Sequence, residues 1–456
     1  MTIRNDRADS SPVALGASTG RLRRGVDGVS LLTVYLVLLF AIPSNLTVTA
    51  VGSLGRPSLI WGLVLIVFWG VSRLQRRTSD ARPPRPSVSF AFALLLVLAL
   101  IGFAAALLRG QPDDQVSPAF TAIVRLLSWG GVVLVAIDGV RTIDDVTRMM
   151  RRLVIATGLL AALGIAQFLT GQTLLDFFNG IPGISNSGGG VLERGGVTRA
   201  SGTAIHPLEY ATTLICVLPF AIAGAISGGY RWDRRSSGFL WWIPVVLIAV
   251  SALVGVSRSA IVGFALAAVF MIPAIPRRFR VAVIAGGVLL GGAVVAALPG
   301  LLGTTLGLFA GAATDPSAQS RVGGLDKAPQ FIGTSPIIGA GWGTFLPRYY
   351  IFDNEWVLIA VEMGLLGAAA FGWLLISAAW SALAARRRMP RHDVRLVGYA
   401  LTVSVAVVGV MLAFFDGLSF PISAGTLFMV LGLCGSLRNI RSTLPPGFST
   451  DRVRSG

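Results

Sequence analysis

The sequence predicts an all-α fold: a polytopic transmembrane helical bundle of about 12 spans, with a large outer loop carrying short surface helices. Composition is the first reason, because 54% of the 456 residues are hydrophobic and only 13% are charged, and the mean hydropathy is +0.75. Soluble globular domains are far less apolar. The second reason is that apolar runs near twenty residues recur, each able to cross about 30 Å of hydrocarbon. The third is the alternation of arginine-rich and arginine-poor connections between these runs.

The predicted spans follow the apolar runs in chain order. The first run follows a polar and basic stretch and is long enough to span, so we expect no cleavable signal peptide. The spans are predicted near 29–48, 58–73, 88–108, 119–137, 153–170, 207–227, 239–255, 259–275, 281–299, 356–379, 396–415 and 421–437.

The connections between spans predict which side of the membrane each one faces. One set is rich in arginine, which the positive-inside rule assigns to the cytoplasm: 73–86, 141–152, 230–235, 276–280, 386–395 and the tail from Arg438. The other set carries few basic residues and is assigned to the outer side: 51–58, 109–118, 171–206, 256–258, 300–355 and 416–419. The net charge of +17 is therefore mostly topology rather than affinity for nucleic acid.

This topology predicts a multi-pass protein of the cytoplasmic (inner) membrane with both termini in the cytoplasm. We expect a cytoplasmic N-terminal tail over 1–28, a transmembrane domain over 29–437 and a cytoplasmic tail over 438–456. The outer loop 300–355 is too long to be a simple turn, and it contains short apolar pieces at 301–312 and 331–345. It is predicted to fold as a cap at the membrane surface.

Arginines on the predicted outer side need a reason other than topology, and four stand out: Arg199, Arg258, Arg321 and Arg348. Arg258 begins the eighth predicted span, where the helix N-terminus adds its own positive end. A bound anion between the two would explain this arrangement, because a guanidinium donates two parallel hydrogen bonds to a phosphate. The alternative is an interfacial arginine that extends toward lipid phosphates, and it is favoured for Arg348, which precedes two tyrosines.

Acidic residues gather where the outer loop enters the tenth predicted span. Asp353, Asn354 and Glu355 are typical of a helix start, where they cap the helix and complement its dipole. Glu362 follows seven residues after Glu355, on the same helix face and about 10 Å deeper. An ionisable group at that depth faces a cavity or a polar partner, for example Arg125 of the fourth predicted span.

The sequence gives little reason to expect a metal or cofactor. His206 and His392 lie on opposite predicted sides, and Asp113–Asp114 have no evident partner ligand. The glycine-rich stretch 339–343 lacks the Lys and Ser/Thr of a nucleotide-binding loop. Cys216 and Cys434 lie in apolar runs far apart in sequence and are expected to be buried thiols.

Four stretches, taken in order, resemble the O-antigen ligase and O-antigen polymerase-like family of membrane glycosyltransferases. They are "RASGTAIHPLEYA" (199–211), "VSRSAIVGF" (256–264), "SRVGGLDKAPQFIGTSPIIGAGWGTF" (320–345) and "DNEWVLIAVEMGLLG" (353–367). Each motif is weak alone, but their order, spacing and predicted outer placement all agree with the family pattern over roughly residues 199–370. The remaining spans agree only in number.

The resemblance implies metal-independent, inverting transfer of a polyprenyl-pyrophosphate-linked oligosaccharide to an acceptor hydroxyl on the outer face of the membrane. Carried onto this sequence, Arg258 and Arg321 would bind the pyrophosphate, and Arg199 and His206 match an earlier motif of less defined role. Asp353 stands where ligases carry a histidine and would activate the acceptor; Asn354, Glu355 and Glu362 would support it. This departure favours a polysaccharide polymerase over a ligase that attaches finished glycan to a lipid or other acceptor.

A transporter or flippase of lipid-linked glycan is the alternative from another functional class. The span number permits it, but transporters typically show paired halves and charges at the membrane midplane. Here the charged candidates gather at one predicted surface, and no matching halves are found. A peptidoglycan glycosyltransferase of the shape, elongation, division and sporulation type is disfavoured by its fewer spans and different motifs. The expected partners are thus the lipid-linked donor, a glycan or lipid acceptor and the bilayer, not nucleic acid.

Overall fold

The computed structural model places most of the chain in helices. The residues that it describes are 27–75, 87–186, 192–194, 197–230, 238–255, 257–297, 316–387 and 392–442. Most of both predicted tails, and the apolar piece 301–312 of the predicted cap, lie outside these ranges.

Within the described residues, every long element is an α-helix. The helices are α1 (Gly28–Ala41), α2 (Pro57–Leu74), α3 (Val88–Leu108), α4 (Asp113–Gly139), α5 (Ile143–Thr170), α6 (Pro207–Ile226), α7 (Trp242–Val254), α8 (Arg258–Met271), α9 (Arg277–Ala297), α11 (Pro316–Thr334), α12 (Glu355–Arg387), α13 (His392–Met411) and α14 (Pro421–Ser442). Short 3-10 helices are η1 (Thr49–Leu54), η2 (Asp176–Gly180), η3 (Gly238–Trp241), η4 (Ile272–Ala274) and η5 (Gly417–Ser419). The predicted all-α class is confirmed.

The strands of the described residues form two small antiparallel pairs. They are β1 (Leu46–Val48) with β2 (Ile184–Asn186), and β3 (Leu192–Arg194) with β4 (Val197–Arg199). In the first pair Leu46 lies opposite Asn186. This pairing joins the connection after α1 to the long connection between α5 and α6.

Each predicted span coincides with a helix, but their lengths differ from the expectation. Seven helices of the described residues are long and apolar enough to cross a membrane: α2, α3, α4, α5, α6, α12 and α14. Five further apolar helical segments have 10–17 residues, so the count of about twelve spans stays a prediction. The first predicted span, 29–48, is wrong at its end, because α1 stops at Ala41. Pro43 cannot donate to a continued helix, and the chain turns into β1.

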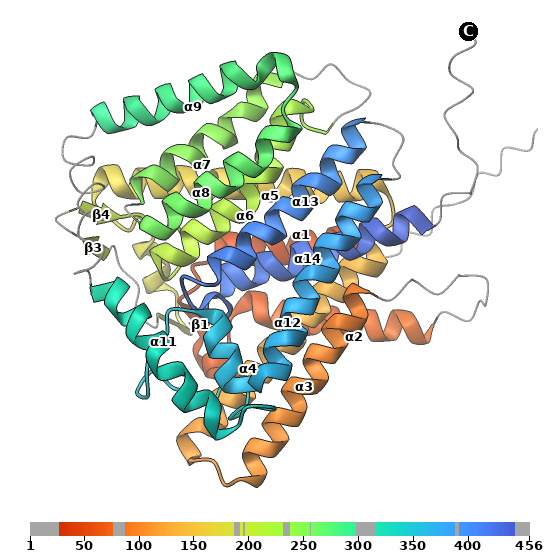
Figure 1. Cartoon of the computed structure of the whole chain (residues 1–456), viewed down its shortest axis with the longest axis vertical. Coiled ribbons are helices and arrows are strands. Elements are labelled where there is room, and N and C mark those ends of the chain that lie inside the picture. Colours follow the sequence, from red (N-terminus) through yellow and green to blue (C-terminus); the bar gives the residue numbers. More distant parts are fainter. Residues whose placement is uncertain are drawn as a thin grey trace, which may run out of the picture.

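Two helices, α6 and α14, form the centre of the bundle (Figure 1). Buried residues make up 94% of the apolar window of α6 but only 22% of that of α2. In Figure 1, α9 lies along one edge of the molecule, and its side chains Val281 and Leu289 are largely exposed. Apolar side chains that face outward on peripheral helices are what a lipid environment requires, so the protein is a membrane protein.

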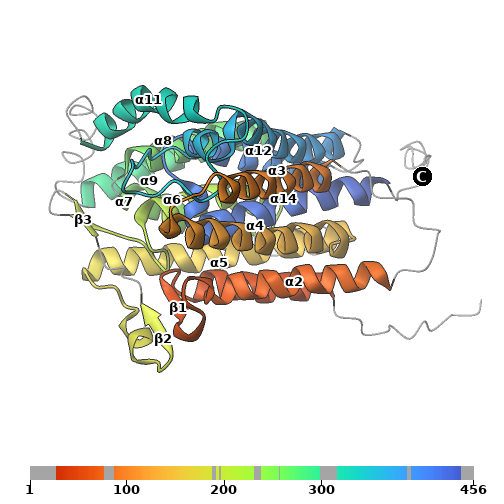
Figure 2. The ribbon, with the colours of Figure 1, turned by 90° about the horizontal axis from the view of Figure 1, so that it is seen from below.

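The predicted outer connections come together at one end of the bundle, called the site end from here on. Figure 2 shows β1, β2 and β3 at this end of the long helices. The backbone N–H of Ser44 donates to the carbonyl of Thr203 at 2.8 Å, and Arg109 donates to the carbonyl of Gly339 at 2.9 Å. Segments predicted to share one side of the membrane therefore contact one another directly.

Several predicted cytoplasmic connections meet at the other end, called the opposite end. Arg73 pairs with Asp138 at 2.7 Å, and Arg151 donates to the carbonyls of Gly229 and Tyr230 at 3.3 Å. Contacts of this kind join the ends of neighbouring helices across short connections.

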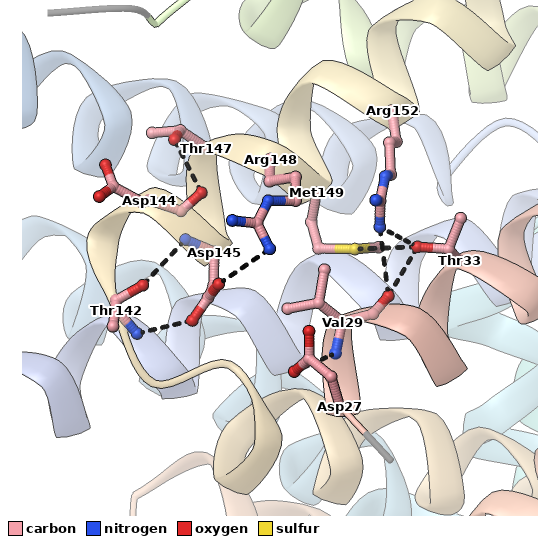
Figure 3. Close-up of polar contacts among 10 residues, drawn as sticks. All are labelled: Asp27, Val29, Thr33, Thr142, Asp144, Asp145, Thr147, Arg148, Met149 and Arg152. Carbon is pink, nitrogen blue, oxygen red and sulfur yellow. Dashed lines mark hydrogen bonds and ion pairs between the residues drawn. The ribbon is translucent and has the colours of Figure 1, made fainter. Parts of the chain in front are cut away.

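The start of α5 shows how the opposite end is organised (Figure 3). Thr142 and Asp145 form a reciprocal capping box, and Asp145 also pairs with Arg148 at 3.4 Å. Arg152, two turns into the helix, donates to the hydroxyl of Thr33 on α1. The acidic and basic side chains of this turn thus neutralise or satisfy each other locally.

The predicted cap contains one long helix rather than several short ones within its described residues. This helix, α11, has 19 residues and packs on the first half of α12. A small hydrophobic cluster, separate from the main core, contains Ala328 of α11, Phe352 of the loop before α12 and Val361 of α12. One continuous helix pairs most of its backbone N–H and C=O groups internally. Several short helices would have more ends, and the unpaired groups at those ends would need water or capping side chains.

Two glycines allow the chain after α11 to lie directly against α12. Gly339 (φ 72°) and Gly364 (φ 67°) both adopt left-handed conformations. A Cβ on Gly339 would lie 2.3 Å from the backbone of Glu362, and one on Gly364 would lie 2.2 Å from the carbonyl of Ile337. Only residues without a side chain permit this contact, which brings the segment after α11 back to the helix that carries Glu362.

Candidate active site

The connection between α13 and α14, taken together with the first residue of α14 (residues 412–421, called the 412–421 connection), is where the separate sequence motifs meet. Its Leu418 N–H donates to Glu355 Oε2 at 2.8 Å, and its Asp416 Oδ1 accepts from the Asn354 N–H at 2.9 Å. Immediately after it, the Ile422 N–H of α14 donates to Glu209 Oε1 at 2.6 Å. The 412–421 connection therefore joins the start of α12 to the start of α6.

Glu209, in the first turn of α6, is fully buried and has its acceptors satisfied by three elements. Besides Ile422, it accepts from the Ser44 hydroxyl at 3.1 Å and the Ile205 N–H at 3.0 Å, both through Oε2. A buried carboxylate held by neutral donors, and not by an ion pair, fixes the relative positions of α1, α6 and α14. Glu209 is thus a positioning group.

The cap of α12 is made by Asn354, and not by the neighbouring carboxylate of Asp353. Two N–H groups of the first turn donate to Asn354 Oδ1 at 3.1 and 3.3 Å. The N–H of Glu355 donates to the Leu412 carbonyl at 2.8 Å. Asn354 therefore caps α12.

The backbone at Asp353 is unusual for a residue with a side chain. Its φ is 48°, in the left-handed region that Asp and Asn tolerate better than most residues. Asp353 is half-buried. The next residue, Asn354, donates its backbone N–H to Asp416. This conformation sets Asp353 at the rim of the 412–421 connection.

His206 and Arg199 lie together at the start of α6. His206 Nδ1 accepts from the Leu208 N–H at 3.1 Å and so caps the helix. Burial, and then the charge of Arg199, lower the pKa of His206 to about 4. His206 is therefore neutral at pH 7, with Nδ1 as acceptor and Nε2–H as the remaining donor.

Arg258 is the first residue of α8, as predicted. The first turn of this helix holds no acid, and Ser257 makes no side-chain cap hydrogen bond. Gly263 packs against the Sδ of Met411, the last residue of α13. Arg258 precedes that contact by five residues, about 7.5 Å along the helix toward the site end, so it lies near the 412–421 connection.

The other predicted site residues divide into support and surface. The structure describes only the backbone of Arg321, within α11. Glu362 accepts from the Phe345 N–H at 3.1 Å, so its expected pairing with Arg125 is wrong: backbone donors of the loop before α12 satisfy it. Arg348 is exposed and binds Asp114; its hydrogen bonds to Tyr349 and Asp114 raise its pKa.

Sequence reasoning missed Glu209 and Asp416 as members of this site. Glu209 lies inside the motif "HPLEYA", and Asp416 lies in the short connection predicted before the last span. An acid beside an apolar run is the signal they share with Asp353. Within the described ranges no group of three or more His, Cys, Asp or Glu side chains is close enough to hold a metal. The two cysteines are buried and free, as predicted.

Residues 243–372 match the family model described as O-antigen ligase. The match covers less than one third of the chain, from α7 to the middle of α12, and it contains Arg258, Arg321 and Asp353. It confirms the resemblance found in the sequence motifs of this region, whereas Arg199, His206 and Glu209 lie before it. No curated protein matches the chain.

Proposed function

We propose that the protein is a membrane glycosyltransferase that moves an oligosaccharide from a polyprenyl-pyrophosphate donor to an acceptor sugar hydroxyl on the outer face of the cytoplasmic membrane. One observation carries this proposal: the 412–421 connection joins the two ends of the motif region, the start of α6 and the start of α12. Residues about 150 positions apart in sequence thereby share one site. The match of residues 243–372 to the O-antigen ligase model supports the same class of reaction.

The arginines of the site supply the positive charge that a diphosphate leaving group needs. Arg258 stands at a helix N-terminus without an acid in its turn, and Arg199 lies beside His206. Guanidinium groups and helix N–H groups stabilise the charge that develops on the leaving oxygen, so the reaction proceeds without a metal in this proposal. Arg321 of α11 would complete the group from the cap, and neutral His206 would donate through Nε2–H.

Asp353 is the proposed acceptor-activating residue. The acceptor hydroxyl oxygen attacks the anomeric carbon of the donor sugar from the face opposite the diphosphate. The bond from that carbon to the diphosphate oxygen breaks, and the polyprenyl diphosphate leaves with the electron pair. The hydroxyl proton passes to the Asp353 carboxylate. The new glycosidic bond therefore has inverted configuration.

Polymerisation of a cell-surface polysaccharide is the proposed outcome. A carboxylate in place of the histidine expected of ligases favours a polymerase. In this chain the carboxylate is that of Asp353, which is followed directly by Asn354. A polymerase acts on one kind of lipid-linked substrate in two roles, as donor and as acceptor. A ligase would instead attach the finished glycan to a different lipid.

The test is glycan transfer by the purified full chain in lipid vesicles, with a labelled polyprenyl-pyrophosphate oligosaccharide as the only substrate. Longer lipid-linked chains are expected from the wild type. Arg258→Gln and Asp353→Asn should each lower the rate by at least about 100-fold, the typical effect of removing one charge-stabilising group or base. Arg348→Gln, an exposed arginine at the same end, is the matched control and should retain activity.

Three results would contradict parts of this proposal. Full transfer by an Arg258→Gln/Arg321→Gln double variant would exclude the diphosphate site. Movement of labelled substrate across the vesicle membrane without new glycosidic bonds would indicate a transporter. Transfer only when a second, unrelated lipid acceptor is added would indicate a ligase.

A further inference from the structure

A second basic pocket lies at the site end and shares Leu418, Ser419 and Pro421 of the 412–421 connection with the site described above. It is formed by Arg56 at the start of α2, Arg125 of α4, Tyr35 of α1, and Ser419 just before α14. The recess is partly open, and its enclosed space is small, about 20 Å³. None of the proposed catalytic or diphosphate-binding residues lines it.

The charges of this pocket are not balanced by the protein. The Nε atoms of Arg56 and Arg125 are both shielded from solvent and have no hydrogen-bond partner among the described residues. Glu209 acts on Arg56 through space, but its oxygens already accept from Ser44, Ile205 and Ile422. Two half-buried arginines beside one fully occupied carboxylate leave an excess of positive charge, which a bound anion would balance.

Two helix starts add to this positive field. Pro57 is the first residue of α2, and Pro421, which lines the pocket, is the first residue of α14. Ser58, also in the wall, belongs to the first turn of α2. Helix N-termini carry a partial positive charge, and phosphate is the anion that suits such a site together with arginine.

The pocket is separated from the proposed diphosphate site by the starts of α6 and α14. Glu209 ties these two helices to Ser44 of the α1–α2 connection. Arg258 belongs to α8, which packs on α6 and α13, whereas α2 and α4 pack on each other and α4 packs on α14. The two basic groups therefore lie on opposite sides of the central helices.

An apolar hollow continues the basic pocket along α1. Arg56, Ser58 and Pro421 line both, and the hollow, with about 10 Å³ of enclosed space, adds the apolar side chains of Leu38 and Leu39. A phosphate bound by Arg56 and Arg125 would thus lie beside a surface that accepts hydrocarbon. This arrangement favours a phosphate carried by a lipid chain over a free phosphate ion.

We propose that Arg56 and Arg125 bind the diphosphate of a second lipid-linked glycan, the molecule whose sugar hydroxyl attacks the donor. This inference rests on the proposed function and names where its acceptor is held. Two diphosphate sites on either side of α6 and α14 suit a polymerase, which must hold two lipid-linked chains at once.

The test is binding stoichiometry, measured by calorimetry on the purified full chain with farnesyl diphosphate as the probe. The wild type is expected to bind two molecules per chain. An Arg56→Gln/Arg125→Gln variant should lose one site, and Arg258→Gln should weaken the other by at least about tenfold. Arg56→Lys/Arg125→Lys, which keeps the charge, should retain weak binding at the first site and serves as the folding control, with Arg348→Gln as the control for surface charge.

Competing probes distinguish the source of the phosphate. Phosphatidylglycerol that displaces farnesyl diphosphate equally well from the Arg56/Arg125 site would mark it as a structural lipid site and overturn the proposal. Inorganic pyrophosphate binding as tightly as farnesyl diphosphate would overturn the lipid-linked part. A single site in the wild type, or two sites in the Arg56→Gln/Arg125→Gln variant, would overturn the whole inference.

A kinetic measurement separates this inference from the proposed function. With donor and acceptor supplied as distinct labelled glycans, the Arg56→Gln/Arg125→Gln variant should raise the KM for the acceptor at least about tenfold with little change for the donor. Transfer with an unchanged acceptor KM would sink the inference alone. Two intact binding sites without any transfer would sink the proposed function alone.

Discussion

The two ends of the bundle differ in how their less exposed arginines are paired, although exposed Arg348 at the site end binds Asp114. At the opposite end Arg73 binds Asp138 and Arg148 binds Asp145, so charges are matched within or between neighbouring turns. At the site end the buried acid Glu209 is held by a hydroxyl and backbone N–H groups instead. The buried Nε atoms of Arg56 and Arg125 are left without acceptors among the described residues.

This difference separates topology from function. Arginines that set the orientation of a membrane protein need only to stay hydrated or paired, and they can be matched by local acids. Arginines kept apart from the available carboxylates retain their charge for something else. The comparison therefore predicts that the buried carboxylate of Glu209 matters for stability, and that Arg56 and Arg125 matter for ligand binding.

The largest expected effect on stability is the loss of Glu209. Glu209→Ala removes the acceptor of three buried donors, and we expect the free energy of unfolding to fall by roughly 3 kcal/mol. Asp138→Ala at the opposite end removes the acceptor of the Trp69 ring N–H and the ion-pair partner of the partly exposed Arg73. We expect this change to lower the free energy of unfolding by only about 1 kcal/mol. Thermal melting in detergent measures both. Equal decreases in the free energy of unfolding for Glu209→Ala and Asp138→Ala would contradict the proposed difference between the two ends.

The second effect is a dependence on pH carried by His206. Its pKa is lowered to about 4 in the folded protein, so the unfolded chain binds the proton first as the pH falls below about 6.5. Stability is therefore fully present above pH 6.5 and is lost toward pH 4, by roughly 2 kcal/mol for a partly exposed side chain.

His206→Asn is the matched variant for this measurement. Asn can still accept from the Leu208 N–H and cap α6, but it does not titrate. Melting temperatures at pH 7 should be similar, and the drop between pH 6.5 and 4 should be smaller in the variant. An unchanged drop would assign the acid sensitivity to other groups.

The third effect distinguishes two adjacent residues at the start of α12. Asn354→Ala removes the cap and should lower the free energy of unfolding by about 1 kcal/mol. Asp353→Asn keeps a residue that tolerates the left-handed backbone and should change stability by less than about 0.5 kcal/mol, while abolishing transfer. A stability loss in Asp353→Asn as large as that in Asn354→Ala would show that the Asp353 carboxylate has a structural role.

The smallest effect is expected at the paired arginines. Arg73→Gln breaks a partly exposed ion pair and should cost about 0.5 kcal/mol or less, with the difference shrinking as salt is added. Arg348→Gln, fully exposed at the site end, should leave melting unchanged and transfer intact. A large loss of transfer in the Arg73 variant would show that the opposite end takes part in function.

The sequence by itself determined the helical class, the position of each apolar helix and the grouping of connections at two ends. Apolar run length and the placement of arginine are local properties that can be read without the fold. The motifs around Arg258 and Asp353 also pointed to the region that matches a family model.

Only the tertiary structure decided which acids hold the site together and which residues remain for chemistry. The contact of Asp416 with the Asn354 N–H and the contact of Glu209 with the Ile422 N–H join residues 62 and 213 positions apart in sequence. The same holds for Glu362, whose partner is a backbone N–H of the preceding loop and not Arg125. A side chain's charge is local in sequence, but its partner is chosen by packing, because buried polar groups must find acceptors and donors wherever the fold places them.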